Sequence, residues 1–165
     1  MPARQLLALL QIPDSFWHWL TVSPWAKVMN GPEWMFPVVQ SFHFIGFAFS
    51  IGTIAIVDLR LLGLGMTRQT AAELHSDLNR WSWIGIAMML ITGPLMFSAD
   101  APTYHYNPAF RFKMEILTAA ILYQLTFQRW AVRDNVPPIL AKLAGLVSLA
   151  LWTLVLAGGR SIAFI

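Results

Sequence analysis

Four apolar stretches, separated by short polar segments, dominate the pattern of the chain. The first contains no formally charged side chain. A helix rises ~1.5 Å per residue, so a stretch of this length crosses the ~30 Å hydrocarbon core of a bilayer. The second and third stretches are close to the lower limit of about 17 residues for a spanning helix. The pattern predicts four transmembrane helices: Phe36–Val57, Trp81–Phe97, Met114–Trp130 and Ile139–Gly158.

The first 33 residues follow a different pattern, with apolar and polar positions mixed. We expect an amphipathic helix near Pro13–Leu20 at the membrane surface, because tryptophan is favoured at the level of the lipid headgroups. The tryptophans concerned are Trp17, Trp19 and Trp25. No small-residue cleavage site follows the short apolar run before Pro13, so no cleavable signal peptide is expected. The predicted fold is therefore all-α, with an interfacial segment over residues 1–33 and an integral membrane four-helix bundle over residues 34–165.

Composition supports a membrane protein and excludes several other classes. Of the 165 residues, 57% are hydrophobic and 12% are charged, whereas soluble domains carry about twice that charged fraction. The net charge of +3 comes from scattered basic residues, so nucleic acid is not an expected partner. The chain has no cysteine, which excludes disulfides, thiolate metal sites and thiol catalysis.

The distribution of basic residues predicts the orientation of the bundle. Cytoplasmic loops of membrane proteins carry an excess of lysine and arginine. Here most basic residues flank the first and third loops: Arg60, Arg68, Arg80, Arg129, Arg133 and Lys142. These loops are therefore expected in the cytoplasm, with both termini outside.

A histidine inside the first apolar stretch is the main candidate for chemistry. Ionisable residues within a membrane span are rare and mark functional sites. Gly46, Ser50 and Thr53 share a helix face with His43 and would leave room for a flat group such as a porphyrin. Neutral imidazole is a common metal ligand and a proximal haem ligand, and His105 on the second loop is a candidate further metal ligand. The alternative is an ordinary helix contact, in which the imidazole hydrogen-bonds to a neighbouring helix.

Basic residues are predicted on the same side of the membrane as His43. Arg111 and Lys113 open the third predicted helix, and Arg160 closes the fourth. Cations beside an intramembrane histidine would suit an anionic ligand, such as the propionates of a haem or a lipid headgroup. The alternatives are a lysine that snorkels to the surface and an arginine that favours the helix dipole after Gly158 and Gly159.

Several motifs identify a family resemblance. They are Pro37-x5-His43-x2-Gly46, Asp58-Leu59-Arg60-Leu61-Leu62-Gly63-Leu64, Thr92-Gly93-x3-Phe97 and Asn107-Pro108-x-Phe110-x2-Lys113. In these motifs the chain resembles a family of small bacterial four-helix membrane proteins of unknown function, over roughly residues 30–160. One departure is Gln40, at a position where the family often has a glutamate. The resemblance implies a multi-pass protein of the bacterial inner membrane, for which the charge pattern predicts periplasmic termini.

More distantly, the chain is similar to the membrane domain of copper-resistance protein D and to the four-helix haem-containing protoporphyrinogen oxidase of bacteria. The shared features are the histidine in helix one, the Thr-Gly pair in helix two, the lysine that opens helix three and the terminal Gly-Arg pair. The oxidase binds haem b, so the resemblance implies functional roles for His43 and Lys113.

Three functional hypotheses follow. The first is a b-type haem protein that transfers electrons, as a subunit of a larger membrane complex or a homo-oligomer; any enzymatic activity would be that of a membrane oxidoreductase. The second is a copper-handling protein with His43 and Met96 as ligands, although the methionines do not cluster along the chain. The third is a structural or assembly subunit without cofactor, whose aromatic surfaces contact lipid and partner helices. The predicted cofactor-binding residues are His43, Gly46, Ser50, Arg111, Lys113 and Arg160, and the predicted metal ligands are His43 and His105.

Overall fold

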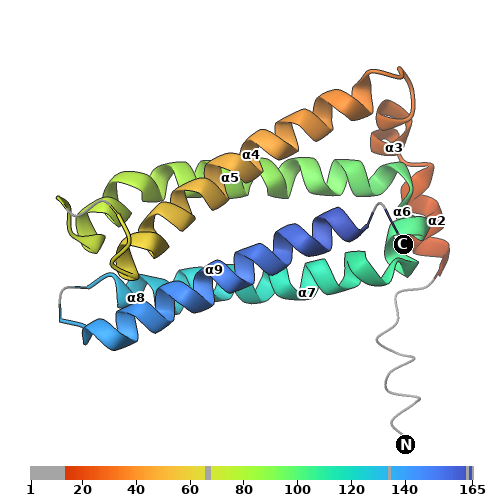
Figure 1. Ribbon diagram of the computed structural model, residues 1–165. Coiled ribbons are helices and arrows are strands. Elements are labelled where there is room, and N and C mark those ends of the chain that lie inside the picture. The colour runs from red at the N-terminus through yellow and green to blue at the C-terminus, as the bar shows by residue number, and fades with distance from the viewer. Residues whose placement is uncertain (1–13, 66–67, 134, 163, 165) are drawn as a thin grey trace, which may run out of the picture.

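The computed structural model describes residues 14–65, 68–133, 135–162 and 164, and this part of the chain is all-helical (Figure 1). Three helices are long and apolar enough to cross a membrane, namely α4, α5 and α9. They fit a multi-pass membrane protein whose apolar surfaces contact lipid. The helices are α2 (Asp14–Thr21), α3 (Pro24–Met29), α4 (Met35–Leu61), α5 (Ala71–Ala99), α6 (Ala101–Tyr106), α7 (Pro108–Tyr123), the π-helical turn η1 (Gln124–Gln128), α8 (Arg129–Ala131) and α9 (Pro138–Ser161).

The third predicted span lies in a helical stretch whose winding changes along its length. α7, η1 and α8 follow one another without a break from Pro108 to Ala131. The π-helical turn falls at Gln124–Gln128, inside the predicted span 114–130. Sequence periodicity gave no sign of this turn.

The second predicted span, Trp81–Phe97, lies inside a longer helix, because α5 begins at Ala71 and ends at Ala99. Thr70 and Glu73 form a capping box: Thr70 Oγ1 accepts a hydrogen bond from Glu73 N (3.1 Å), and Glu73 Oε2 accepts one from Thr70 N (2.8 Å). This reciprocal pair satisfies backbone donors of the first turn and starts the helix in polar sequence. The apolar stretch therefore marks only part of a longer helix.

The predicted second loop, residues 98–113, is also largely helical. It contains α6 and the beginning of α7. Asn107 caps α7, since its Oδ1 accepts hydrogen bonds from Ala109 N (2.9 Å) and Phe110 N (3.1 Å). Asn107 Nδ2 also donates to Ile162 O (3.3 Å), which ties this corner to the end of α9.

α4 and α5 form an antiparallel pair held at close range by small residues. A Cβ atom at Gly46 would lie 2.8 Å from Met88 Cβ and 2.9 Å from Gly85 O. About two turns further along α4, the hydroxyl oxygens of Thr53 and Ser82 lie 2.7 Å apart. Small residues and interhelical hydrogen bonds are what bring helices together in lipid, where apolar burial alone does not.

α7 and α9 form the second antiparallel pair, and α9 also crosses α4. At this crossing a Cβ atom on Gly145 would lie 2.9 Å from the backbone oxygen of Asp58. α4 and α9 lie close together at the end that carries this contact, and they diverge towards the other end (Figure 1). His43 belongs to the diverging part of α4.

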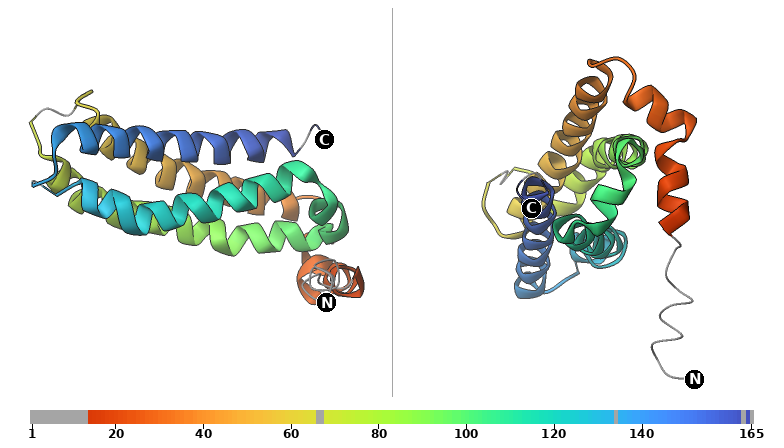
Figure 2. Two further views of the ribbon diagram at one scale, coloured as in Figure 1. Left: turned by 90° about the horizontal axis from the view of Figure 1, so that it is seen from below. Right: turned by 90° about the vertical axis from the view of Figure 1, so that its right-hand side faces the viewer.

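The two N-terminal helices lie beside one end of the long helices (Figure 2). The ring of Trp17 in α2 stacks on His105 in α6, with 4.2 Å between ring centroids. Asn30 Nδ2, just after α3, donates to Ala99 O (2.9 Å). The helix predicted near Pro13–Leu20 is present as α2, although Pro13 lies outside the described residues.

Candidate functional site

The imidazole of His43 is half-buried and joined to α5 by a hydrogen bond. The Thr92 hydroxyl oxygen lies 2.8 Å from His43 Nδ1 and 2.7 Å from Met88 O. When Thr92 donates its proton to Met88 O, the neutral imidazole carries its own proton on Nδ1 and its lone pair on Nε2. Within the described residues, no hydrogen bond engages Nε2.

The backbone beside this imidazole is glycine. A Cβ atom at Gly93 would lie 3.7 Å from His43 Cε1. The Thr-Gly pair of the sequence motif therefore has a physical meaning: Thr92 orients the imidazole, and Gly93 leaves its edge uncovered by a side chain. A metal-ligating histidine donates its other ring N–H in the same way, which orients the ring and raises its basicity.

Gly46 and Ser50 do not line an open space, and the prediction that they leave room for a flat cofactor was wrong. Both are buried against Gly85 of α5. A Cβ atom at Gly85 would contact Gly46 O and Ser50 N directly. The small residues on this face let two helix backbones approach each other, which was the alternative interpretation.

Lys113 lies across from His43, on α7, and packs along the glycine pair of α9. A Cβ atom at Gly159 would lie 3.6 Å from Lys113 Nζ, and one at Gly158 would lie 3.2 Å from Lys113 Cβ. The ammonium charge acts electrostatically on His43. Within the described part of the chain, this half-buried ammonium has no carboxylate partner or hydrogen bond. A buried charge without a partner is costly, so the position suits an anionic ligand.

The two arginines of the predicted site are more exposed. The guanidinium of Arg160 lies over the ring of Phe164, 5.6 Å from its centroid. Arg111 is exposed, as is Glu115. None of the three forms an ion pair with another described residue.

His105 lies on α6, where its ring contacts are with aromatic neighbours. It stacks on Trp17 and meets Tyr106 edge to face, with centroids 5.1 Å apart. Among the described residues, no group of three His, Asp or Glu side chains is placed to hold a metal ion. The structure thus joins His43 to Thr92 by a contact and places Lys113 within electrostatic range of the imidazole. His105 contacts Trp17 of α2 and its neighbour Tyr106.

A second buried polar group lies further along the bundle. Asp58 on α4 accepts a hydrogen bond at Oδ1 from Gln128 Nε2 on η1 (2.6 Å). Ser148 on α9 lies near the same carboxylate. Among the described residues, neither its hydroxyl nor Asp58 Oδ2 has a hydrogen-bond partner. The sequence showed Asp58 near a predicted membrane boundary. The signal that would have found its partners is the pair of glutamines inside an apolar stretch, Gln124 and Gln128.

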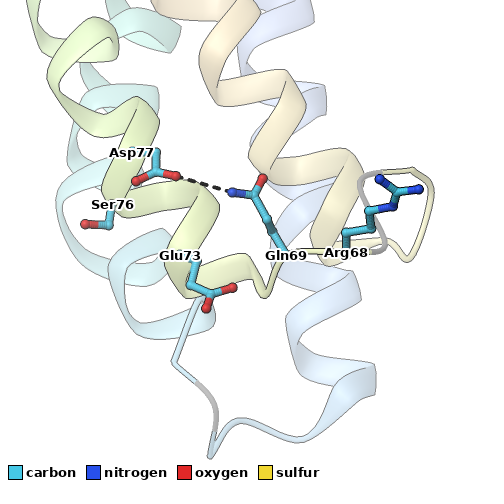
Figure 3. A pocket seen from close by; sticks show the side chains of 5 residues that line it. All are labelled: Arg68, Gln69, Glu73, Ser76 and Asp77. Atoms are coloured by element: carbon cyan, nitrogen blue, oxygen red, sulfur yellow. Dashed lines mark hydrogen bonds between the residues drawn. The ribbon is translucent and has the colours of Figure 1, made fainter.

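The end of the bundle that holds the first and third loops carries polar pockets on its surface. One, of about 460 Å³, is lined by Arg68, Gln69, Glu73, Ser76 and Asp77 (Figure 3). Gln69 Nε2 donates to Asp77 Oδ2 across it (3.4 Å), and Arg68 points away from the others. A second, of about 380 Å³, is lined in part by Arg60, Arg133 and Lys142. The basic residues used to predict orientation therefore gather at one end.

Comparison with known proteins gives a family and no activity. Residues 25–165 match the family of unknown function DUF6644. No curated protein and no solved structure matches the chain.

Proposed function

Since the chain belongs to the DUF6644 family, whose function is unknown, we propose from the site itself that it binds haem b and transfers electrons within a membrane. The observation that carries this proposal is the half-buried His43, whose Nδ1 is held by Thr92 and whose Nε2 lone pair is unengaged. Imidazole nitrogen of this kind is the standard proximal ligand of haem iron. Bound haem would supply one-electron redox chemistry.

The residues around His43 fit an anionic cofactor. Lys113 brings a positive charge without a described counter-ion, and a haem propionate would provide one. α4 and α9 diverge on this side of the bundle (Figure 1), and Gly93 keeps the imidazole edge free of a side chain. Arg111 and Arg160 are surface cations that would reach a propionate only by moving. The role proposed for the chain is that of a redox subunit, in a larger complex or a homo-oligomer.

The visible spectrum of protein purified from membranes in mild detergent tests this function. We expect a Soret band in the wild type, because the haem would be retained by an iron–imidazole bond. His43→Ala should lose the band and still insert. His75→Ala is the matched control, since His75 is a half-buried histidine on α5 outside the site. Lys113→Ala should weaken haem retention more than Arg111→Ala, because Lys113 alone is half-buried beside the histidine.

The outcomes separate the alternatives. A wild type without a Soret band but with bound copper would favour the copper-handling hypothesis. A wild type with neither would contradict both redox hypotheses and leave the structural subunit. Loss of haem in His75→Ala to the same degree as in His43→Ala would also contradict the proposed site.

We further propose four membrane crossings, with the continuous stretch α7–η1–α8 as one of them. The N-terminal helix α2 would lie at the periplasmic surface of the bacterial inner membrane, and both termini would be periplasmic. The gathering of Arg60, Arg133 and Lys142 at one end supports this orientation. With four crossings, the first and third loops both lie on the cytoplasmic side.

Labelling of single cysteines tests this topology, and the absence of native cysteine makes each variant report one site. Three exposed positions serve: Leu64, Thr103 and Asn135. We expect Thr103→Cys to react with an impermeant thiol reagent added outside. Leu64→Cys and Asn135→Cys should react only after the membrane is opened. If Asn135→Cys and Thr103→Cys label from the same side, α7–η1–α8 does not cross the membrane.

A further inference from the structure

A layer of polar side chains lies in the middle of an otherwise apolar interior. Above and below it are two apolar clusters, one around Val57 and Ala144 and the other around Ile54 and Trp152. The layer draws on three elements of the fold: α4, η1 and α9. Its members are Asp58, Gln124, Gln128 and Ser148, none of which is more than 4% exposed.

One hydrogen bond fixes the orientation of the Gln128 amide in this layer. Gln128 Nε2 donates to Asp58 Oδ1 at 2.6 Å, so the other side of that amide presents its oxygen. Four buried oxygen atoms then have no hydrogen-bond partner in the part of the chain that the structure describes. They are Asp58 Oδ2, Gln124 Oε1, Gln128 Oε1 and Ser148 Oγ.

This set of atoms has more hydrogen-bond acceptors than donors. Three of the four oxygens are acceptors that carry no proton, and only the serine hydroxyl is able to donate. Buried polar atoms are nearly always satisfied, because each unsatisfied one costs about 1–3 kcal/mol. In lipid no bulk water compensates them. The layer therefore calls for something positively polarised between these oxygens.

The π-helical turn carries the two glutamines of the layer at its two ends. Hydrogen bonds in a π-helix join residues five apart and widen the turn, and such turns occur frequently at functional sites. Gln124 opens η1 and Gln128 closes it, so both amides are presented from the same widened turn. The change of winding belongs to the backbone, since a regular helix through this stretch would carry the same two glutamines.

We propose that the buried oxygens around Asp58, those of Gln128 and Ser148 among them, bind a small monovalent cation, either a proton or Na⁺, with Asp58 as its counter-charge. Carboxylate, amide and hydroxyl oxygens are hard ligands that suit such ions. A single carboxylate balances one positive charge, whereas calcium sites draw on several carboxylates among six to eight oxygen ligands. Carboxylates inside membrane spans commonly mark ion pathways and proton relays.

The neighbouring charged and titratable groups leave the four oxygens unpaired. The Tyr123 hydroxyl donates to Ala144 O (3.1 Å) and is thereby engaged next to the layer. Arg60 Nε donates to Gln69 O (2.6 Å). The remaining groups near this part of α4, α5, α8 and α9 are His75, Arg129 and Lys142.

Purified protein in detergent, compared in NaCl and choline chloride at equal ionic strength and over a pH series, tests this site. If the ion is Na⁺, sodium should raise the melting temperature of the wild type. This effect should be lost in Asp58→Asn and retained in Asp77→Asn, which alters an exposed carboxylate. If the ion is a proton, the infrared spectrum should show a protonated carboxyl band near neutral pH that is absent only from Asp58→Asn.

Ser148→Ala provides a milder variant, since it removes one oxygen and leaves the bond between Asp58 and Gln128 intact. If the ion is Na⁺, this variant should raise the sodium concentration at half-maximal stabilisation by about tenfold. If the ion is a proton, it should shift the frequency of the carboxyl band. The proposal would be overturned if the infrared spectrum showed an ionised Asp58 and if sodium left the melting temperature of the wild type unchanged. The four oxygens would then be satisfied by internal water alone.

Discussion

Gly85→Ala should lower the free energy of unfolding by about 1–3 kcal/mol, the range for overpacking a tight interior. The new methyl group would contact Gly46 O and Ser50 N, and it would lie 3.0 Å from Ser50 Cα. All three are backbone atoms of α4, so no side-chain rotation relieves the clash. The two helices must move apart, which weakens both hydrogen bonds across the pair, His43–Thr92 and Thr53–Ser82.

Titration with a denaturing detergent, followed by circular dichroism, measures this loss. Gly52→Ala is the matched control, because Gly52 is an exposed residue of α4 with no atom within 4 Å of an added Cβ. Alanine has the higher helix propensity, so the control should be neutral or slightly stabilising. Equal stability of the two variants would mean that α4 and α5 do not approach each other at Gly85.

Apolar stretches predicted the all-helical fold and the position of the long helices well, because hydropathy responds directly to the lipid environment. They located the ends poorly. α5 begins in polar sequence since the helix start is decided by the capping box of Thr70 and Glu73, not by hydropathy. α6 lies between the second and third predicted spans, where a loop was expected.

At the candidate site the role of His43 stays a prediction, and the structure corrects the surroundings expected for it. An intramembrane histidine must point towards a partner, and two partners were considered: a neighbouring helix or a metal. The structure provides Thr92 on Nδ1 and leaves Nε2 to the proposed haem. Small residues on the same face as His43 were ambiguous, because a glycine that makes room for a porphyrin is the same glycine that lets another helix approach. Only the position of Gly85 resolves this ambiguity.

The polar layer escaped prediction for a different reason. Asp58, Gln128 and Ser148 are far apart in the sequence, and each has an ordinary interpretation on its own. Their significance depends on the crossing of α4 and α9 at Gly145 and on the π-helical turn, and both are properties of tertiary packing. A glutamine inside an apolar span was the one available signal.

Gln128→Leu should destabilise the protein by about 1–3 kcal/mol, because it removes the donor to Asp58 Oδ1 and leaves that oxygen buried without a partner. Interhelical hydrogen bonds in membranes contribute ~0.6 kcal/mol on average. The larger figure is expected here because the acceptor is a carboxylate that is fully buried. Breaking a buried ion pair costs about 3–5 kcal/mol, and the proposed cation at Asp58 should keep the loss below that range.

The same detergent titration measures this effect, with Gln40→Leu as control, since the side chain of Gln40 on α4 forms no hydrogen bond with another described residue. The double variant Asp58→Leu/Gln128→Leu should recover part of the lost stability, because replacing both partners of a buried polar pair leaves no unsatisfied group. It should at the same time lose any sodium or proton dependence. A double variant less stable than either single one would show that the polar layer stabilises the bundle by itself, and that its oxygens are not retained for an ion.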